Sequence, residues 1–330
     1  MTIHTYAGDL SPRTAAKANK TLLKRGIPHL VAEMFGQAKP MTMNNTKTMT
    51  FRRYEALSNQ PKVLTEGVTP ASSNLSKTDY TATLVQYGDW VELTDVIMDT
   101  HEDPVLQESV TILGEQAAQM IERTRFNVLK AGTNVFYANG ASRSAVNTKM
   151  TRALQRKITR SLKRQLAKKI TRKVSASPDY GTDAVAPSYI AIAHSDCESD
   201  IRDMEGFVPV ERYGSGQTPY EMELGKVEDV RYLCSTLLDP WVDAGGLDGD
   251  AVLSTTGTNA DVYPILFFGQ DAYGIIPFKG KHAVQTIIRN PKADSTDPLA
   301  QRGSAGWKAM TTALILNDAW MARAEVAVSV

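Results

Sequence analysis

Apolar side chains recur at three- and four-residue steps over residues 104–131, a spacing that places them on one side of an α-helix. The stripe consists of Leu106, Val110, Leu113, Ala117, Met120, Ile121 and Val128. Asp103 can cap the first turn, Pro104 fits there because its φ is already helical, and Gly132 can end the helix. The pattern predicts a helix roughly 42 Å long, at 1.5 Å per residue, that acts as the spine of a domain.

A second helical pattern covers residues 149–173. Its apolar positions are four residues apart: Met150, Leu154, Ile158, Leu162, Leu166, Ile170 and Val174. At 100° per residue, such a stripe drifts about 40° at each step and spirals around the helix. We therefore expect this helix either to wrap around a curved partner or to break partway, near Ile158 and Thr159.

Two stretches rich in β-formers precede the long helix. Residues 48–54 partly alternate between polar and apolar side chains, and residues 80–96 are rich in Thr, Val, Tyr and Trp. Residues 55–79 between them show little periodicity and are too many for a compact turn. The pattern predicts a long hairpin whose projecting tip needs a partner to cover it. That tip consists of Leu64, Thr65, Glu66, Gly67, Val68, Thr69 and Pro70.

The two ends and the second half of the chain have hydrophobic patterns that differ from those of the helices and the hairpin. Residues 1–46 have few repeating apolar positions, and Gly26, Pro28, Gly36 and Pro40 break regular structure, so this arm is expected to gain order only by lying on something else. From about Asp179 the chain holds short strand-like runs among glycine-rich turns, which indicates a mixed α+β domain. The final run, Trp307–Val330, predicts one or two strands that return to the domain of the long helix.

Charge is distributed unevenly along the chain. Residues 123–178 contain fifteen Lys and Arg and no acid, whereas the remaining chain has 22 bases against 36 acids. This asymmetry indicates two surfaces that face different electrostatic surroundings.

The sequence offers no constellation for catalysis, cofactor binding or metal binding. The five histidines are scattered, and the cluster from His194 to Cys197 is best explained as a turn after a strand, with Asp196 as a helix cap. Cys197 and Cys234 lack metal-type spacing and are expected to stay reduced. No phosphate-binding or dinucleotide motif occurs, and neither a signal peptide nor a membrane-spanning run is expected. We therefore predict a protein that is not an enzyme and carries no cofactor or metal.

Seven short stretches, taken in order, carry a family resemblance. They are LTEGVTP (64–70), YGDWVELTD (87–95), YIAIAHSD (189–196), ELGKVEDVRY (223–232), DVYP (261–264), GQDAY (269–273), and DPL (297–299) with GWK (306–308). In these stretches the chain resembles the major capsid proteins of N-four-type phages, which have the Hong Kong 97 capsid fold of tailed phages and herpesviruses.

The resemblance implies an α+β chain with the parts of that fold. These are an N-terminal arm (1–46), an extended loop (47–95), a peripheral domain with the spine helix (104–131) and the basic helix (149–173) inside 96–182, an axial domain (183–299), and return strands (300–330). It also implies self-assembly into hexamers and pentamers of an icosahedral virion capsid around double-stranded DNA, after synthesis in the host bacterial cytoplasm. The loop tip, with Leu64, Thr65, Glu66, Gly67, Val68 and Pro70, would contact a neighbouring subunit.

Partners beyond the shell itself follow from the same resemblance. Some relatives carry a fused scaffolding segment before the extended loop, for which this arm is too short. A separate scaffolding or decoration protein and a portal are therefore expected.

In such a shell the basic helix has three interpretations. The first places five bases towards the packaged DNA, without sequence preference: Arg152, Arg156, Arg160, Lys163 and Arg164. In the second, these bases pair with acidic axial domains or arms of adjacent subunits, and in the third they form a solvated face. Two other functions stay open, an encapsulin-like nanocompartment shell protein and a non-specific nucleic-acid-binding protein.

Overall fold

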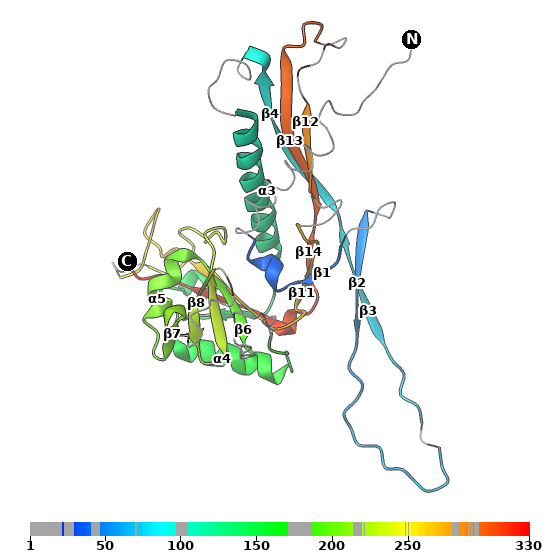
Figure 1. The fold of residues 1–330 in the computed structure, drawn as a ribbon. Coiled ribbons are helices and arrows are strands. Elements are labelled where there is room, and N and C mark those ends of the chain that lie inside the picture. The colour runs from blue at the N-terminus through cyan, green and yellow to red at the C-terminus, as the bar shows by residue number, and fades with distance from the viewer. Residues whose placement is uncertain are drawn as a thin grey trace.

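The chain forms an upper body, a lower body and a projecting hairpin (Figure 1). The upper body is a long helix packed on a small sheet, and the lower body is a seven-stranded sheet with helices against it. The computed structural model describes residues 22, 30–40, 47–69, 71–96, 105–170, 187–213, 220, 222–247, 249, 251–278, 284–289, 291, 293 and 297–330.

The spine helix α3 (Val105–Leu129) has the predicted phase. It packs on an antiparallel sheet in the order β12 (Val284–Arg289), β13 (Arg302–Thr311) and β4 (Val85–Thr94). Leu113, Ala117 and Ile121 form one core with Leu93 and Trp307 of the sheet. The expected cap residues Asp103 and Pro104 lie outside the described residues.

The predicted hairpin is present, but its second strand is divided. β2 (Thr48–Tyr54) pairs antiparallel with β3 (Lys77–Thr83), and residues 55–69 and 71–76 lie in the loop beyond them (Figure 1). The sequence predicted one strand over residues 80–96, whereas the chain changes partner at Leu84 and continues as β4 along β13. Leu84 packs with Met49 and Phe51 of β2, and this contact fixes the point of division.

The lower body is built around a seven-stranded sheet. Its order is β5 (Val135–Tyr137), β15 (Met321–Val326), β10 (Tyr263–Phe268), β6 (Tyr189–Ala193), β9 (Val230–Cys234), β8 (Glu223–Val227) and β7 (Phe207–Pro209). The central strands β15, β10 and β6 are buried along their whole length. Separate apolar clusters lie on the two faces, one including residues of α4 and the other Phe126 and Leu129 at the end of α3.

The basic helix α4 (Arg152–Arg164) differs from the prediction in length and in place. It packs on the seven-stranded sheet through Leu154, Ile158 and Leu162, and not beside the spine helix. Because the four-residue stripe drifts, its next member cannot reach the sheet: Leu166 is 81% exposed, with φ of 55°. The helix therefore ends at Arg164, which differs from both alternatives that the spacing had left open, a helix that wraps around a curved partner and a break near Ile158 and Thr159.

The C-terminal strands divide between the two bodies, so the expected return to the spine domain holds for one of them and not for the others. β13 does pack on α3, but β15 enters the large sheet between β5 and β10. β14 (Ala313–Ile315) belongs to a third sheet with β11 (Tyr273–Ile275) and β1 (Gln37–Ala38) of the arm. Through β1, the arm segment lies on its own chain.

Short elements complete the described chain. They are the 3₁₀ helices η2 (Ala32–Met34), η3 (Arg143–Ala145), η4 (Ser195–Cys197), η5 (Val210–Arg212) and η6 (Asp318–Trp320), and the α-helix α5 (Glu198–Arg202). No described helix combines the length and the apolar character that crossing a lipid bilayer requires.

Candidate interaction surfaces

The tip of the hairpin loop exposes apolar side chains to solvent. Val63 is 91% exposed, Leu64 71% and Val68 63%. The chain turns at Gly67, whose φ of 77° favours glycine, and the amide of Val68 donates to the carbonyl of Thr65. Pro70, also predicted for this contact, lies outside the described residues. These side chains have no core of their own to join.

Polar contacts hold the loop and its base. The Nζ of Lys62 donates to the carbonyl of Ala71 and to the hydroxyl of Ser73 across the loop, at 3.0 and 2.8 Å. At the base, Glu55 accepts from Arg53 and from the Thr78 hydroxyl, which also holds the pKa of Glu55 below its usual value. The projecting shape is therefore braced from within.

The basic face of α4 lies over the turn that joins β8 and β9. Buried Gln155 fixes this arrangement, because its amide donates to the carbonyl of Val227 and accepts from the hydroxyl of Tyr232, both at 2.8 Å. The turn consists of Glu228 and Asp229, and Glu228 has a left-handed backbone with φ of 51°. Two carboxylates are thus placed directly beside the basic helix.

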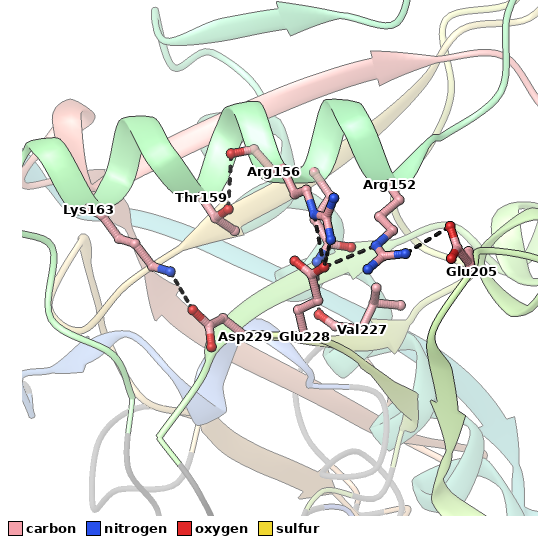
Figure 2. Close-up of polar contacts among 9 residues, drawn as sticks. Arg152, Arg156, Thr159, Lys163, Glu205, Val227, Glu228 and Asp229 are labelled. Carbon is pink, nitrogen blue, oxygen red and sulfur yellow. Dashed lines mark hydrogen bonds and ion pairs between the residues drawn. The ribbon is translucent and has the colours of Figure 1, made fainter.

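Three of the five predicted bases pair with acids of the same chain (Figure 2). Arg152 contacts Glu228 at 3.0 Å and Glu205 at 2.8 Å. Arg156 donates through Nε to Glu228 at 2.9 Å, and Lys163 contacts Asp229 at 2.5 Å. Hydrogen bonds from Arg156 and from Lys163 hold the pKa of Glu228 and Asp229, respectively, below their usual values.

The other two predicted bases, Arg160 and Arg164, have no ion-pair partner among the residues that the structure describes. Together with four neighbours they line a shallow, open depression of about 430 Å³. The neighbours are Arg156, Thr159, Lys163 and Glu228. The depression therefore presents two guanidinium groups that form no ion pair with any acid in the described part of the chain.

The same pairing extends over the acid-free segment as a whole. Of its thirteen described bases, eight form ion pairs with acids of this chain: Arg123, Arg125, Arg143, Lys149, Arg152, Arg156, Lys163 and Lys169. Sequence reasoning had considered DNA, adjacent subunits and solvent, but not acids of the same chain. Much of the charge asymmetry is thus compensated by folding.

A buried ionic cluster between the arm and the spine helix was not predicted. Glu122 is fully buried and accepts from the amide of Ala32 at 2.6 Å. Arg125 contacts Glu33 at 3.0 Å and Glu122 at 3.5 Å, and it donates to the carbonyl of Ile276 at 2.7 Å. Burial raises the pKa of Glu122 to about 7. The sequence signal was an acid and a base, three residues apart, at inward positions of an apolar stripe.

The candidate chemistry around His194 is a structural turn, as predicted, with one difference. His194 caps η4 through Nδ1, which accepts from the amide of Asp196 at 3.1 Å, so the cap is the histidine and not Asp196. Cys197 and Cys234 are free thiols, and burial raises the pKa of both, that of Cys234 to about 12. Within the described part of the chain, no three His, Cys, Asp or Glu gather as metal ligands would.

Comparison with known proteins shows which family and which solved structures this chain is similar to. A family model of phage capsid proteins matches residues 78–324, and none of the curated protein sequences matches the chain. Among solved structures, the capsid of Ralstonia phage GP4 is 13% identical with a TM-score of 0.65, and the match covers 88% of this chain and 87% of that chain. The heads of Helicobacter pylori phages KHP40 and KHP30 are 14% and 12% identical, with TM-scores of 0.61 and 0.59 and the same coverage.

The family match spans well over half of the chain, and the solved structures share its fold across both bodies. The mixed α+β architecture agrees with the Hong Kong 97-like capsid fold that the sequence motifs had implied. The chain therefore belongs to the phage capsid protein family, and it is a major capsid protein located in the virion capsid.

Proposed function

We propose that this capsid protein forms hexamers and pentamers that close into an icosahedral head around double-stranded DNA, and that it acts as a structural component without a catalytic site. The observation that carries the proposal is the projecting loop. Its apolar side chains, Val63, Leu64 and Val68, are exposed in the single chain. Each Val or Leu gains roughly 1.5–3 kcal/mol when it is fully buried, so a neighbouring subunit that covers the tip stabilises the assembly.

The shape of the loop also explains why rings would form. A loop that leaves one subunit and lies on a different surface of the next makes a head-to-tail contact. Such contacts generate closed rings when the rotation between subunits closes. Hexamers and pentamers are two such rings, and together they can close a shell. A separate scaffolding or decoration protein and a portal complete this proposal.

The test is a pair of substitutions in the loop, Leu64→Ser with Val68→Ser. We expect the variant to fold with the thermal stability of the unaltered protein but to give few or no shells in electron micrographs, because the tip contributes to an interface and not to the core. Leu166→Ser, which alters a similarly exposed leucine elsewhere, should assemble normally. Shells formed in normal yield by the loop variant would overturn the proposal.

A further inference from the structure

We infer that the depression formed by Arg160 and Arg164 on α4 holds phosphate groups of the packaged DNA, whereas the paired bases beside it do not. This inference rests on the proposed function, in which the shell encloses DNA. Of the five bases that the sequence suggested as DNA contacts, the inference keeps only Arg160 and Arg164.

The first argument is the division of the bases into two groups. Arg152, Arg156 and Lys163 each contact a carboxylate of the same chain at 2.5–3.0 Å. The carboxylate offsets part of the charge of a base held in this way and occupies some of its hydrogen-bond donors, so the base attracts a phosphate less strongly than an unpaired one. Arg160 and Arg164 have no such partner among the described residues. Among the five bases predicted from the sequence, these two are therefore the most available to a polyanion.

The second argument is the rigidity of the site. α4 is anchored to the seven-stranded sheet by Leu154, Ile158 and Leu162, and by the hydrogen bonds of Gln155. Arg160 and Arg164 are four residues apart and thus lie on one side of the helix, about 6 Å apart along its axis. A guanidinium group can donate two parallel hydrogen bonds to one phosphate. Two such groups in a row can bind successive phosphates without reading the base sequence.

The third argument distinguishes DNA from a second copy of the chain. The core of a protein–protein interface is apolar and depleted of charged residues. The depression is lined by Arg156, Thr159, Arg160, Lys163, Arg164 and Glu228, with no apolar residue among them. Interfaces with DNA are polar and strongly positive, and they tolerate an open, hydrated surface. The composition of the site fits phosphate better than a neighbouring subunit.

The intrachain carboxylates then act as positioning groups. Glu228 and Asp229 hold Arg156 and Lys163 against the β8–β9 turn, which keeps these side chains from folding across the depression (Figure 2). The C-terminal end of a helix carries a partial negative charge, and Lys163 and Arg164 in the last turn of α4 offset it. An anion can therefore approach this end of the helix.

The test compares two double variants of the protein that remove equal charge. One is Arg160→Gln with Arg164→Gln, and the control is Arg152→Gln with Lys169→Gln, two bases that are paired with acids of the chain and do not line the depression. Binding of a short fluorescent DNA duplex is measured by anisotropy over a range of salt concentrations. Each lost phosphate contact lowers the slope of log K against log salt by about 0.9, so the first variant should lose about 1.8 and the control close to zero.

Shell formation is recorded for the same proteins, so that each outcome has one meaning. An equal loss of slope in both variants, or no loss in the first, would overturn the inference. Unchanged DNA binding with failed shells in the first variant would assign Arg160 and Arg164 to a subunit contact instead. If the unaltered protein forms normal shells but binds no DNA, this inference is overturned and the proposal of shell assembly stands. If the two variants show the predicted slopes but the unaltered protein forms no shells, the proposal of shell assembly is overturned and the phosphate site stands.

Discussion

At the scale of single residues, Glu122 makes the stability of the subunit depend on pH near neutrality. Its pKa is about 7 in the folded chain because burial disfavours the charged form, against an ordinary value of 4.5. Between these two values the folded chain holds a proton that the unfolded chain releases. The stability due to this proton is present in full below about pH 4.5 and is lost as the pH rises through 7.

The corresponding variant is Glu122→Gln, which mimics the protonated side chain. We expect the free energy of unfolding of the unaltered protein to fall from pH 5 to pH 8, with a contribution from Glu122 on the order of 3 kcal/mol. In Glu122→Gln that fall should shrink markedly, as measured by urea unfolding at several pH values. Glu92→Gln, an exposed change on the neighbouring strand β4, serves as the control. Parallel pH profiles for Glu122→Gln and the unaltered protein would contradict the assignment.

The ion-pair partners of the bases on α4 could not be predicted from the sequence. The absence of acids over residues 123–178 correctly marked a basic helix, but the acids that compensate it come from distant segments. Glu228 is 72 residues from Arg156 in the chain, and Asp229 is 66 residues from Lys163. Such pairs depend on how β8 and β9 lie under α4, and local periodicity carries no information about that. The division between paired and available bases therefore required the structure.

At the scale of elements, the phase of the spine helix can be tested with two adjacent residues. Leu113 is 3% exposed and packs in the core between α3 and the sheet, whereas Ile112 is 64% exposed on the same helix. Leu113→Asp buries a carboxylate without a partner, which costs several kcal/mol, and should give insoluble or unfolded protein. Ile112→Asp should fold with nearly unchanged thermal stability. Similar behaviour of the two variants would show that the helix faces the sheet differently.

The elements themselves were predictable to the extent that their periodicity was regular. The stripe of α3 keeps to three- and four-residue steps, so its position and inward face followed from the sequence. The stripe of α4 drifts, and its end was misplaced because only the sheet determines how far the drift is tolerated. Likewise, residues 80–94 are continuous in β-propensity, and only the strand pairings show that the chain changes partner at Leu84, which packs against the cluster that contains Phe51.

At the scale of the whole molecule, sequence patterns could not predict which segments of the chain fold into the upper body and which into the lower body. β15 lies in the seven-stranded sheet and α4 packs on it, although the segment between them in the chain includes β13, which packs with the spine helix. The motifs carried the overall fold through family resemblance, and the strand pairings came only from the structure. The projecting loop is the exception, because a long aperiodic stretch between two β-rich runs already indicated it.

The head-to-tail contact proposed for the loop has a consequence for mixed assemblies. A subunit with Leu64→Ser and Val68→Ser would still offer the surface that receives a neighbour's loop, but its own loop would not hold the next subunit. One such subunit is therefore expected to interrupt the ring that it enters, since every contact is needed for closure. Co-expression of variant and unaltered chains should reduce the yield of shells far more steeply than the fraction of variant. Sedimentation of the particles at several expression ratios measures this, with Leu166→Ser chains as the control. A yield that declines only in proportion to the variant fraction would mean that the loop contributes to each subunit separately, and the ring-closing role would have to be given to another surface.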